Sequence, residues 1–587
     1  MDIQPEIHIE KILEYDDLFI GEDFDIEATL CKYSRELIVK LVNCLGLTYE
    51  KAYIPDANNP FFSSITPKVQ DLDSRLSDFL VKSNQKRIYY CTQRSILELL
   101  RYTFAIPVDK YANGSDLTDF EYDFFKILLK INQQLMHFKS DASKEGIETL
   151  TFLLSYILND VTNADWKSIY QTQVYYIDRL VSFLQSTPQG HNLLENFCMK
   201  LKISSIKEYE QTILALTTLY ISKKKENSRS CPILDLNEIV DETGFFHEEV
   251  CEYLSLDINK YIPYTSETRE NNIDYRELRA HPIIKIGNRR YIIYNLPILC
   301  ERLYNSLFFD FKEFYKGDFF RYYNKEFIEH FLFQRTMLLC IGKTVSAFFP
   351  SKTEIESFEP MKEKPNAPDF YIREKDSIIL FECKGIKING SIRDKADMDE
   401  FINVLKTKLL LSAQNIDPTR KTKSKTELVG ISQLVNSIEA IEDYEFEEDD
   451  KIPSDVSYYP VIVFEDSKLA QIGMMGLLNK WYRQYLLERG LTEQVCNPVI
   501  AMSVSTLYLF SDKFRIFGFQ KIFDEFISTN TIDSKTDQIS PFADFDWYMR
   551  KRYKIAKHIQ HEFVNQVKKC ISKNDVIMQR KFNLWNQ

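Results

Sequence analysis

Apolar residues recur every three to four positions through most of the first 225 residues, which is the spacing of an amphipathic helix. The segments that follow it are ELIVKLVNCLGL, SILELLRYTFAI, YDFFKILLKINQQLMHF, IETLTFLLSYILNDV, VYYIDRLVSFLQ and QTILALTTLYI. No fixed repeat relates them, so the pattern favours a helical bundle over a solenoid. We expect an all-α domain over residues 1–225 that serves as a scaffold or binds a protein partner.

A polar linker and a small mixed module are predicted next, over residues 226–315. The linker is SKKKENSRS, and LDLNEIVDETGFFHEEVCEYLSLDI after it predicts two short helices broken at Gly244. That spacing suits a helix-turn-helix, although glycine between short helices is common without any DNA reading. HPIIKIGNRRYIIYN predicts a β-hairpin that turns at Gly287-Asn288. Together they predict a winged-helix-like α+β module, a type that packs against other domains as often as it touches nucleic acid.

The pattern changes near Tyr315 to an alternation of helices and apolar strands. The helix NKEFIEHFLFQRTMLL precedes the extended segments TVSAFF, PDFYIRE and SIILFECK. Helical KADMDEFINVLKTKLLL and GISQLVNSIEAI follow, and then the strands YYPVIVFED and NPVIAMSVS. The order αβββαβ with buried strands predicts an α/β domain with a mixed central sheet over residues 316–530. For residues 531–587 we expect a helical tail that carries a net positive charge.

Candidate chemistry appears only in this α/β domain. Strand alternation in SIILFECK places Glu382 and Lys384 on one face and Cys383 on the other. Asp369 opens the preceding strand, and a short polar turn joins the two strands, so we expect Asp369 and Glu382 to meet across a hairpin. The alternative is that Glu382 and Lys384 form a solvated ion pair along one strand, which contributes little.

Two carboxylates at the end of an apolar sheet repel each other unless a cation lies between them. Hard oxygen ligands favour Mg²⁺, or Mn²⁺ in its place. A neighbouring lysine can orient an attacking water and offset the negative charge that develops on a phosphate. The residue types therefore predict a metal-dependent phosphodiesterase site.

The combination of Pro368-Asp369, twelve intervening residues and the triplet Glu382-Cys383-Lys384 resembles the signature of the PD-(D/E)xK nuclease superfamily, which has the restriction-endonuclease-like fold. A PD pair or an ExK triplet alone arises by chance in a chain of this length; the combination, placed on adjacent strands after a helix, is more informative. The resemblance implies that Asp369 and Glu382 bind the metal, that Cys383 adds its backbone carbonyl, and that Lys384 serves the attacking water.

Further residues follow from the same resemblance, which covers roughly residues 316–530. The family often adds a glutamate on the helix before the first strand. Glu326 and Glu329 both qualify, and the apolar run HFLF after Glu329 favours it slightly. Many members also place a Gln or Lys on the helix after the motif, where Gln433 is the candidate.

The overall charge argues against indiscriminate binding of a polyanion. Lys and Arg number 74 and Asp and Glu 86, which gives a formal charge of −12. The charge is uneven: residues 1–30 hold ten acids and one lysine, whereas residues 550–587 hold ten Lys or Arg and two acids. That tail is the best candidate for nucleic-acid contact outside the active site. The acidic start could pack against it or cover it as an autoinhibitory segment.

Two loops of the α/β domain carry opposite charge. RKTKSK, residues 420–425, could follow a phosphate backbone, and residues 439–450 hold eight acids and no base. Simple solvation of both is the more ordinary interpretation.

Other features exclude several classes of protein. Glycine is scarce, at 16 of 587 residues, and Gly342-Lys343-Thr344 lacks the earlier glycine of a phosphate-binding loop. Eleven cysteines without a CxxC pair indicate neither a disulfide framework nor a zinc ribbon, and fit a reducing compartment. His558 and His561 lack a third ligand, which predicts an exposed helix face. The acidic N-terminus and the absence of a long apolar run predict a cytoplasmic protein without a membrane anchor.

These observations predict a Mg²⁺-dependent endonuclease that acts on DNA, with RNA left open as a substrate. By analogy alone, a nuclease domain joined to a helical domain suggests an effector of bacterial anti-phage defence or restriction. A homodimer would be natural if both strands are cut. The alternative function is a non-catalytic adaptor that binds nucleic acid or protein on a nuclease-like fold.

Overall fold

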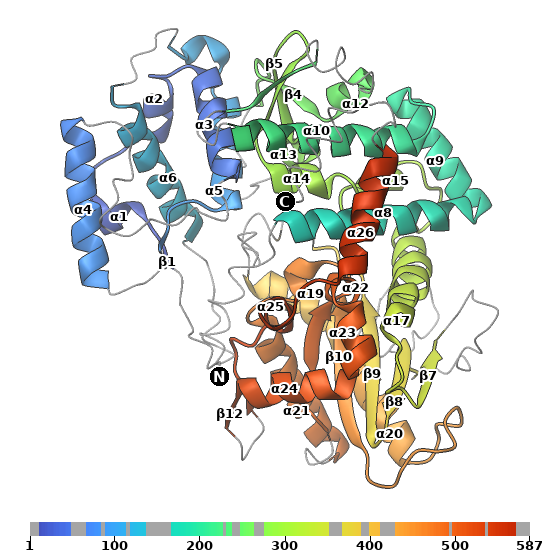
Figure 1. The fold of residues 1–587 in the computed structure, drawn as a ribbon. Coiled ribbons are helices and arrows are strands. Elements are labelled where there is room, and N and C mark those ends of the chain that lie inside the picture. The colour runs from blue at the N-terminus through green and yellow to red at the C-terminus, as the bar shows by residue number, and fades with distance from the viewer. Residues whose placement is uncertain are drawn as a thin grey trace, which may run out of the picture.

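The structure is a computed structural model, which describes residues 11–47, 66–83, 88–112, 118–136, 166–226, 231–236, 247–262, 275–351, 367–388, 392, 398–410, 429–491, 496–533 and 538–570. Over these residues the chain is rich in helix and contains a mixed sheet of five strands and another of four. Figure 1 shows the first helices beside the four-stranded sheet, the five-stranded sheet at the other end of the molecule, and α8 between them. Multiple cores of α and α/β type are thus present, as the hydrophobic pattern predicts.

The first part of the chain is helical. Its elements are β1(Lys11–Ile12), α1(Tyr15–Leu18), α2(Ile26–Leu30), α3(Arg35–Leu47), α4(Pro67–Ser83), β2(Ile88–Tyr89), α5(Gln93–Ala105), η2(Val108–Lys110), α6(Phe120–Met136), α8(Trp166–Gln185), α9(Pro188–Leu201) and α10(Ile206–Glu226). The apolar faces of α1 to α6 form one core, whereas those of α8, α9 and α10 join the core of the five-stranded sheet. The predicted helix over IETLTFLLSYILNDV lies outside the described residues.

The four-stranded sheet separates these two cores. Its order is β3(Ile233–Asp235), β6(Arg290–Ile293), β5(Ile283–Gly287) and β4(Ser255–Asp257), with only β4 and β5 parallel. The helices around it are α12(Glu248–Tyr253), α13(Arg276–Ala280), α14(Leu296–Glu301) and α15(Leu307–Lys312). Because side chains alternate along a strand, Ile283 enters the larger core and Ile284 the smaller one. This sheet therefore mediates packing on both faces.

The expected hairpin of this module is present, with its turn displaced by one residue. Gly287 pairs with Arg290, so the turn is Asn288-Arg289 rather than Gly287-Asn288, and Arg289 takes a left-handed φ of 54°. The second predicted helix corresponds to α12. The first, together with Gly244, lies outside the described residues.

The five-stranded sheet has the order β11(Ile500–Ser503), β10(Ser457–Phe464), β9(Ser377–Lys384), β8(Phe370–Glu374) and β7(Ala347–Pro350). β7, β8 and β9 are antiparallel neighbours, and β9, β10 and β11 run parallel. In chain order, the sheet is preceded by α16(Phe319–Arg321), the π-helical segment η4(Tyr322–Phe333) and α17(Gln334–Cys340). The chain between β9 and β10 contains the helices α19(Met398–Leu409) and α20(Ile431–Glu442). This is the mixed sheet that the order αβββαβ predicts.

The rest of the chain covers the sheet and returns to the helical part. Its elements are η5(Ser467–Leu469), α21(Met474–Arg489), α22(Val504–Leu509), α23(Ser511–Phe517), α24(Phe519–Asn530), β12(Thr531–Asp533), β13(Gln538–Ile539), α25(Phe545–Arg552) and α26(Lys557–Cys570). Tyr508 on α22, directly after β11, stacks on Tyr175 of α8 with 3.7 Å between ring centroids. The carboxyl ends of the parallel strands therefore face the helical part of the chain. Among the described segments, no helix is long and apolar enough to cross a membrane.

The acidic run at residues 439–450 is only partly a solvated loop. Asp449 is buried and accepts hydrogen bonds from Arg373 Nε at 2.6 Å and from Tyr371 Oη at 2.9 Å. The expectation of simple solvation is wrong for Asp449, because it neutralises a cation on β8. The basic stretch at residues 420–425 lies outside the described residues.

Candidate active site

The candidate site lies where the β8–β9 hairpin reaches the carboxyl end of β9. The strand register pairs Phe370 with Phe381, so Asp369, one residue before β8, lies beside Glu382. Asp369 Oδ2 accepts a 2.8 Å hydrogen bond from the backbone N–H of Cys383. The structure thus brings the two carboxylates to the same end of the hairpin, and a backbone hydrogen bond fixes Asp369 there.

Glu382 and Lys384 form an ion pair inside the protein. Lys384 Nζ donates a hydrogen bond to Glu382 Oε1, and the two side chains are only 14% and 1% exposed. They are therefore not a solvated surface pair. The opposite face of β9 is apolar: the ring of Phe381 lies 6.4 Å from that of Phe333 and 5.3 Å from that of Phe519.

The Glu382 carboxyl group has one oxygen without a partner. Its Oε2 atom is buried and accepts no hydrogen bond within the described part of the chain. Burial raises the pKa of Glu382 well above its usual range, the negative charge of Asp369 raises it further, and Lys384 only partly opposes this. The site therefore holds more negative charge than a single lysine balances.

Glu329 belongs to the same electrostatic cluster. Burial raises its pKa to about 8, with the charge of Lys384 lowering it and that of Asp369 raising it. Glu326, one turn earlier, is 41% exposed and lies 3.4 Å from His330 Nδ1. Of the two helix glutamates, Glu329 lies close enough to Lys384 and Asp369 for their charges to act on its pKa, whereas Glu326 lies beside His330. Both lie on η4, and π-helical segments often mark functional sites.

Lys384 remains a cation in this environment. Burial lowers its pKa, but the charges of Glu382, Glu329 and Asp369 outweigh burial and raise the pKa above its ordinary value. A lysine in this state donates hydrogen bonds and stabilises negative charge; it does not accept a proton.

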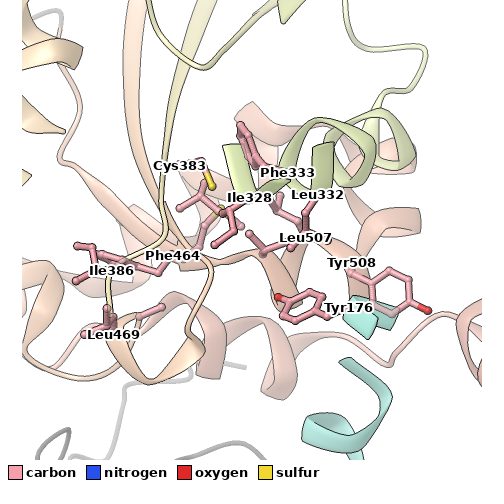
Figure 2. Packing of buried hydrophobic residues seen from close by; sticks show 14 of the residues in the cluster. Tyr176, Ile328, Leu332, Phe333, Cys383, Ile386, Phe464, Leu469, Leu507 and Tyr508 are labelled. Carbon is pink, nitrogen blue, oxygen red and sulfur yellow. The ribbon is translucent and has the colours of Figure 1, made fainter. Parts of the chain in front are cut away.

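Gln433 and Cys383 support the site through the backbone. Gln433 Nε2 on α20 donates a 2.9 Å hydrogen bond to the carbonyl of Ala367, two residues before Asp369. The Cys383 side chain is fully buried among Ile328, Leu332 and Phe333 (Figure 2), and burial raises its pKa well above the usual range. Gln433 thus anchors the segment that carries Asp369. The Cys383 thiol is a core group rather than a nucleophile.

A second lysine–glutamate pair, which the sequence analysis missed, lies at the end of the neighbouring strand. Lys387 Nζ donates to both carboxylate oxygens of Glu465, at 3.0 and 2.8 Å, and the Glu465 side chain is fully buried. The Glu465 N–H also donates to the Lys384 carbonyl at 3.2 Å. The signal available in the sequence was that two apolar strands each have a glutamate near the carboxyl end, Glu382 within β9 and Glu465 one residue after β10.

The residues present fit a divalent cation. Asp369 and Glu382 supply carboxylates, one Glu382 oxygen lacks a partner, and the Cys383 carbonyl lies between Glu382 and Lys384 on the strand. Over the described residues, no three His, Cys, Asp or Glu side chains form a metal-holding group. The oxygen donors at this end of the strand are two carboxylates and one backbone carbonyl, which is the donor type that Mg²⁺ or Mn²⁺ prefers.

The remaining candidates have structural explanations. A side chain at Gly342 would meet the Arg515 carbonyl at 2.0 Å, so this glycine permits close backbone approach, and Thr344 Oγ1 donates to Glu374 at 2.8 Å. His558 and His561 lie on the exposed face of α26, as predicted. Comparison with known proteins assigns the chain to no family: no family model matches the chain, and no curated protein matches its sequence.

Proposed function

We propose that this protein is a metal-dependent nuclease that hydrolyses phosphodiester bonds of DNA at the end of β9. The observation that carries the proposal is the buried convergence of Asp369, Glu382 and Lys384, with a carboxylate oxygen left unpartnered and Glu329 nearby. Such an excess of buried carboxylates is costly in a purely structural role, because each charge needs a partner or a proton. A cation and an anionic substrate would supply that balance.

The architecture supports the finer fold assignment. A helical segment, an antiparallel β7–β8–β9 meander, two helices and the parallel strands β10 and β11 follow in the order of the restriction-endonuclease-like fold. The candidate residues lie at the same end of adjacent strands. This arrangement, together with the Pro368-Asp369 and Glu382-Cys383-Lys384 pattern, is our basis for the PD-(D/E)xK assignment.

Each residue has a separate role in the proposed reaction. Asp369 and Glu382 would hold the cation, which when bound would offset the negative charge of the scissile phosphate. Lys384, a cation held by its carboxylate neighbours, orients the attacking water and stabilises the negative charge that grows on the phosphate oxygens. Glu329, with a pKa of about 8, can take up or release a proton near neutral pH.

The wider setting rests on analogy. We propose a cytoplasmic effector of bacterial anti-phage defence or restriction, with the N-terminal helical part binding a protein partner. RNA is a second possible substrate, and cleavage of both DNA strands would require a homodimer or two events.

The test is nicking of supercoiled plasmid in Mg²⁺ or Mn²⁺ by purified wild-type protein, Asp369→Ala and Lys384→Ala. We expect conversion to open-circular or linear DNA by the wild type alone, with all three proteins folded by circular dichroism. Equal nicking by both variants would overturn the proposal.

A non-catalytic adaptor is the second candidate, favoured by the depth of the site. Asp369 is 7% exposed and Glu382 fully buried, so little of the cluster meets solvent. This candidate predicts no heat of Mg²⁺ or Mn²⁺ binding in calorimetry, whereas the nuclease proposal predicts binding that Asp369→Ala removes.

A further inference from the structure

An unusual surface of exposed aromatic rings lies next to the candidate site. Most phenylalanines in the described segments are buried, yet Phe309 is 59% and Phe320 38% exposed. Both rings pack edge-on against the same buried ring, Phe308, at centroid distances of 5.2 and 6.4 Å. Phe308 thus supports both exposed rings, and exposure of both at once costs apolar burial.

The surface connects directly to the end of β9. Lys387 Nζ lies 6.0 Å from the Phe308 ring centroid and binds Glu465, whose N–H donates to the Lys384 carbonyl. From the other side, Asn324 on η4 abuts Gly385, one residue after Lys384. Phe308, Lys387 and Glu465 thus connect the exposed rings to Lys384, the proposed catalytic lysine.

Cations lie beside Phe320 and on the segment that follows it. Lys408 on α19 places Nζ 5.2 Å from the Phe320 ring centroid, and Arg321 and Lys325 are exposed on the segment that follows Phe320. Lys325 also lies close enough to lower the pKa of Glu329. Of the acids near this segment, Asp318 accepts the backbone N–H of Arg321 at 3.1 Å, Glu313 is paired with Lys200, and Glu326 lies 3.4 Å from His330 Nδ1. Arg321, Lys325 and Lys408 therefore supply exposed positive charge beside Phe320 and along η4.

We infer that the surface of Phe309, Phe320, Arg321, Lys325 and Lys408, the aromatic platform, binds an unpaired strand of nucleic acid beside the site. The inference rests on the proposed nuclease function. Flat exposed rings stack on bases that are not paired, and cations at the ring edges contact the phosphates. A duplex keeps its bases inside, so it would use the cations alone.

A second exposed ring provides a matched control. Phe517 is 38% exposed and has Lys521 Nζ 5.4 Å from its centroid, which is the same local chemistry. It lies near the opposite end of β9, because Gly518 is next to Glu374 at the β8–β9 turn. Phe517→Ala/Lys521→Ala therefore removes an equivalent pair that is far from the site.

The test is fluorescence anisotropy with a labelled 20-nucleotide oligothymidine and a labelled hairpin duplex. It uses the full-length chain carrying Asp369→Asn, which prevents cleavage. We expect tighter binding of the single strand than of the duplex. Phe309→Ala/Phe320→Ala should weaken single-strand binding at least about tenfold and change duplex binding less than about twofold. Lys408→Ala should weaken both, and the Phe517→Ala/Lys521→Ala control neither.

Single-strand binding that is unchanged in Phe309→Ala/Phe320→Ala would overturn the inference. An equal loss in the control, or equal wild-type affinity for strand and duplex, would overturn it as well. The experiment measures binding alone, so its result is separable from the proposed activity. A wild-type protein that shows the expected binding but never nicks plasmid would refute the nuclease and leave the aromatic platform standing.

Discussion

Two lysine–glutamate pairs lie side by side at the carboxyl ends of β9 and β10, and they differ in their charge balance. Lys387 binds both oxygens of Glu465. We call this pair closed, because both carboxylate oxygens have a hydrogen-bond donor and one positive charge balances one negative charge. Lys384 binds one oxygen of Glu382, while the other oxygen lacks a partner and Asp369 and Glu329 add further negative charge. The first pair satisfies its own hydrogen-bonding groups. The second has unsatisfied acceptors that only a proton, a cation or a ligand can balance.

The two pairs differ in their charge balance rather than in burial, and this difference is our basis for proposing a functional role for Glu382 alone. Both glutamates are buried, so burial alone does not separate them. Removal of a partner from a closed pair leaves an isolated buried charge, whereas removal of an excess carboxylate relieves repulsion. Substitutions of the two glutamates should therefore have opposite signatures.

The largest expected effect is on activity. Glu382→Gln keeps the shape of the side chain and an acceptor for Lys384 but removes a cation ligand, so we expect nicking of plasmid to fall at least about 100-fold. Thermal unfolding should show stability equal to or above that of the wild type, because the neutral amide removes the repulsion between Glu382 and Asp369. Full activity, or a large loss of stability, would contradict the assignment of excess charge to Glu382.

Glu465→Gln should show the reverse pattern. It leaves Lys387 buried without an anionic partner, for which we expect a loss of about 3–5 kcal/mol in the free energy of unfolding. Urea denaturation followed by circular dichroism measures this. The double variant Lys387→Met/Glu465→Gln should recover part of the loss. If the single variant is as stable as the wild type, the pair is not the closed structural contact described above.

A smaller effect is expected at the glycine between the two lysines. A Cβ on Gly385 would lie 2.5 Å from Asn324 Oδ1 and 2.7 Å from Ile328 Cδ1, whereas a Cβ on Gly287 would meet nothing closer than 3.9 Å. We expect Gly385→Ala to lower stability by about 1–3 kcal/mol and nicking several-fold, because crowding displaces the end of β9. Gly287→Ala is the matched control and should change neither by more than experimental error. Similar losses in both variants would contradict this explanation.

The smallest effect concerns pH. The pKa of Glu329 is about 8 in the folded chain, above its ordinary value near 4.5, so the folded state binds more protons between these values. The stability that this provides is complete below about pH 4.5 and is lost as the pH rises through about 8. Without divalent cations, Glu329→Gln should thus match the wild type at pH 4, exceed its melting temperature at pH 6 and exceed it by more at pH 9. Equal pH profiles for the wild type and Glu329→Gln would refute the shift.

Local patterns predicted much of this site. The alternation in SIILFECK and the short turn before it are sufficient to place Asp369 beside Glu382, because a hairpin is set by residues close in sequence. Long-range partners were not predictable in the same way. Lys387 and Glu465 are 78 positions apart and meet only because β9 and β10 pair in parallel, and Asp449 binds Arg373 across a similar distance.

The helical part shows a further limit of pattern analysis. The apolar spacing identifies α3, α5, α6, α8 and α10, yet it does not reveal that α8 and α10 belong to the core of the five-stranded sheet. An amphipathic pattern indicates which face is buried and not which neighbour buries it. For the same reason, the spacing of Glu326 and Glu329 did not decide between them, whereas in the structure the charges of Lys384 and Asp369 act on the pKa of Glu329.

The most direct test of the charge imbalance at β9 is calorimetric titration of Mn²⁺ into wild-type protein, Asp369→Asn and the double variant Lys387→Met/Glu465→Gln. Because carboxylates must be ionised to bind a cation, we expect wild-type affinity to rise from pH 6 to pH 8.5. We also expect binding to disappear in Asp369→Asn and to persist in the double variant at the end of β10. No binding by the wild type, or equal binding by Asp369→Asn, would contradict the account.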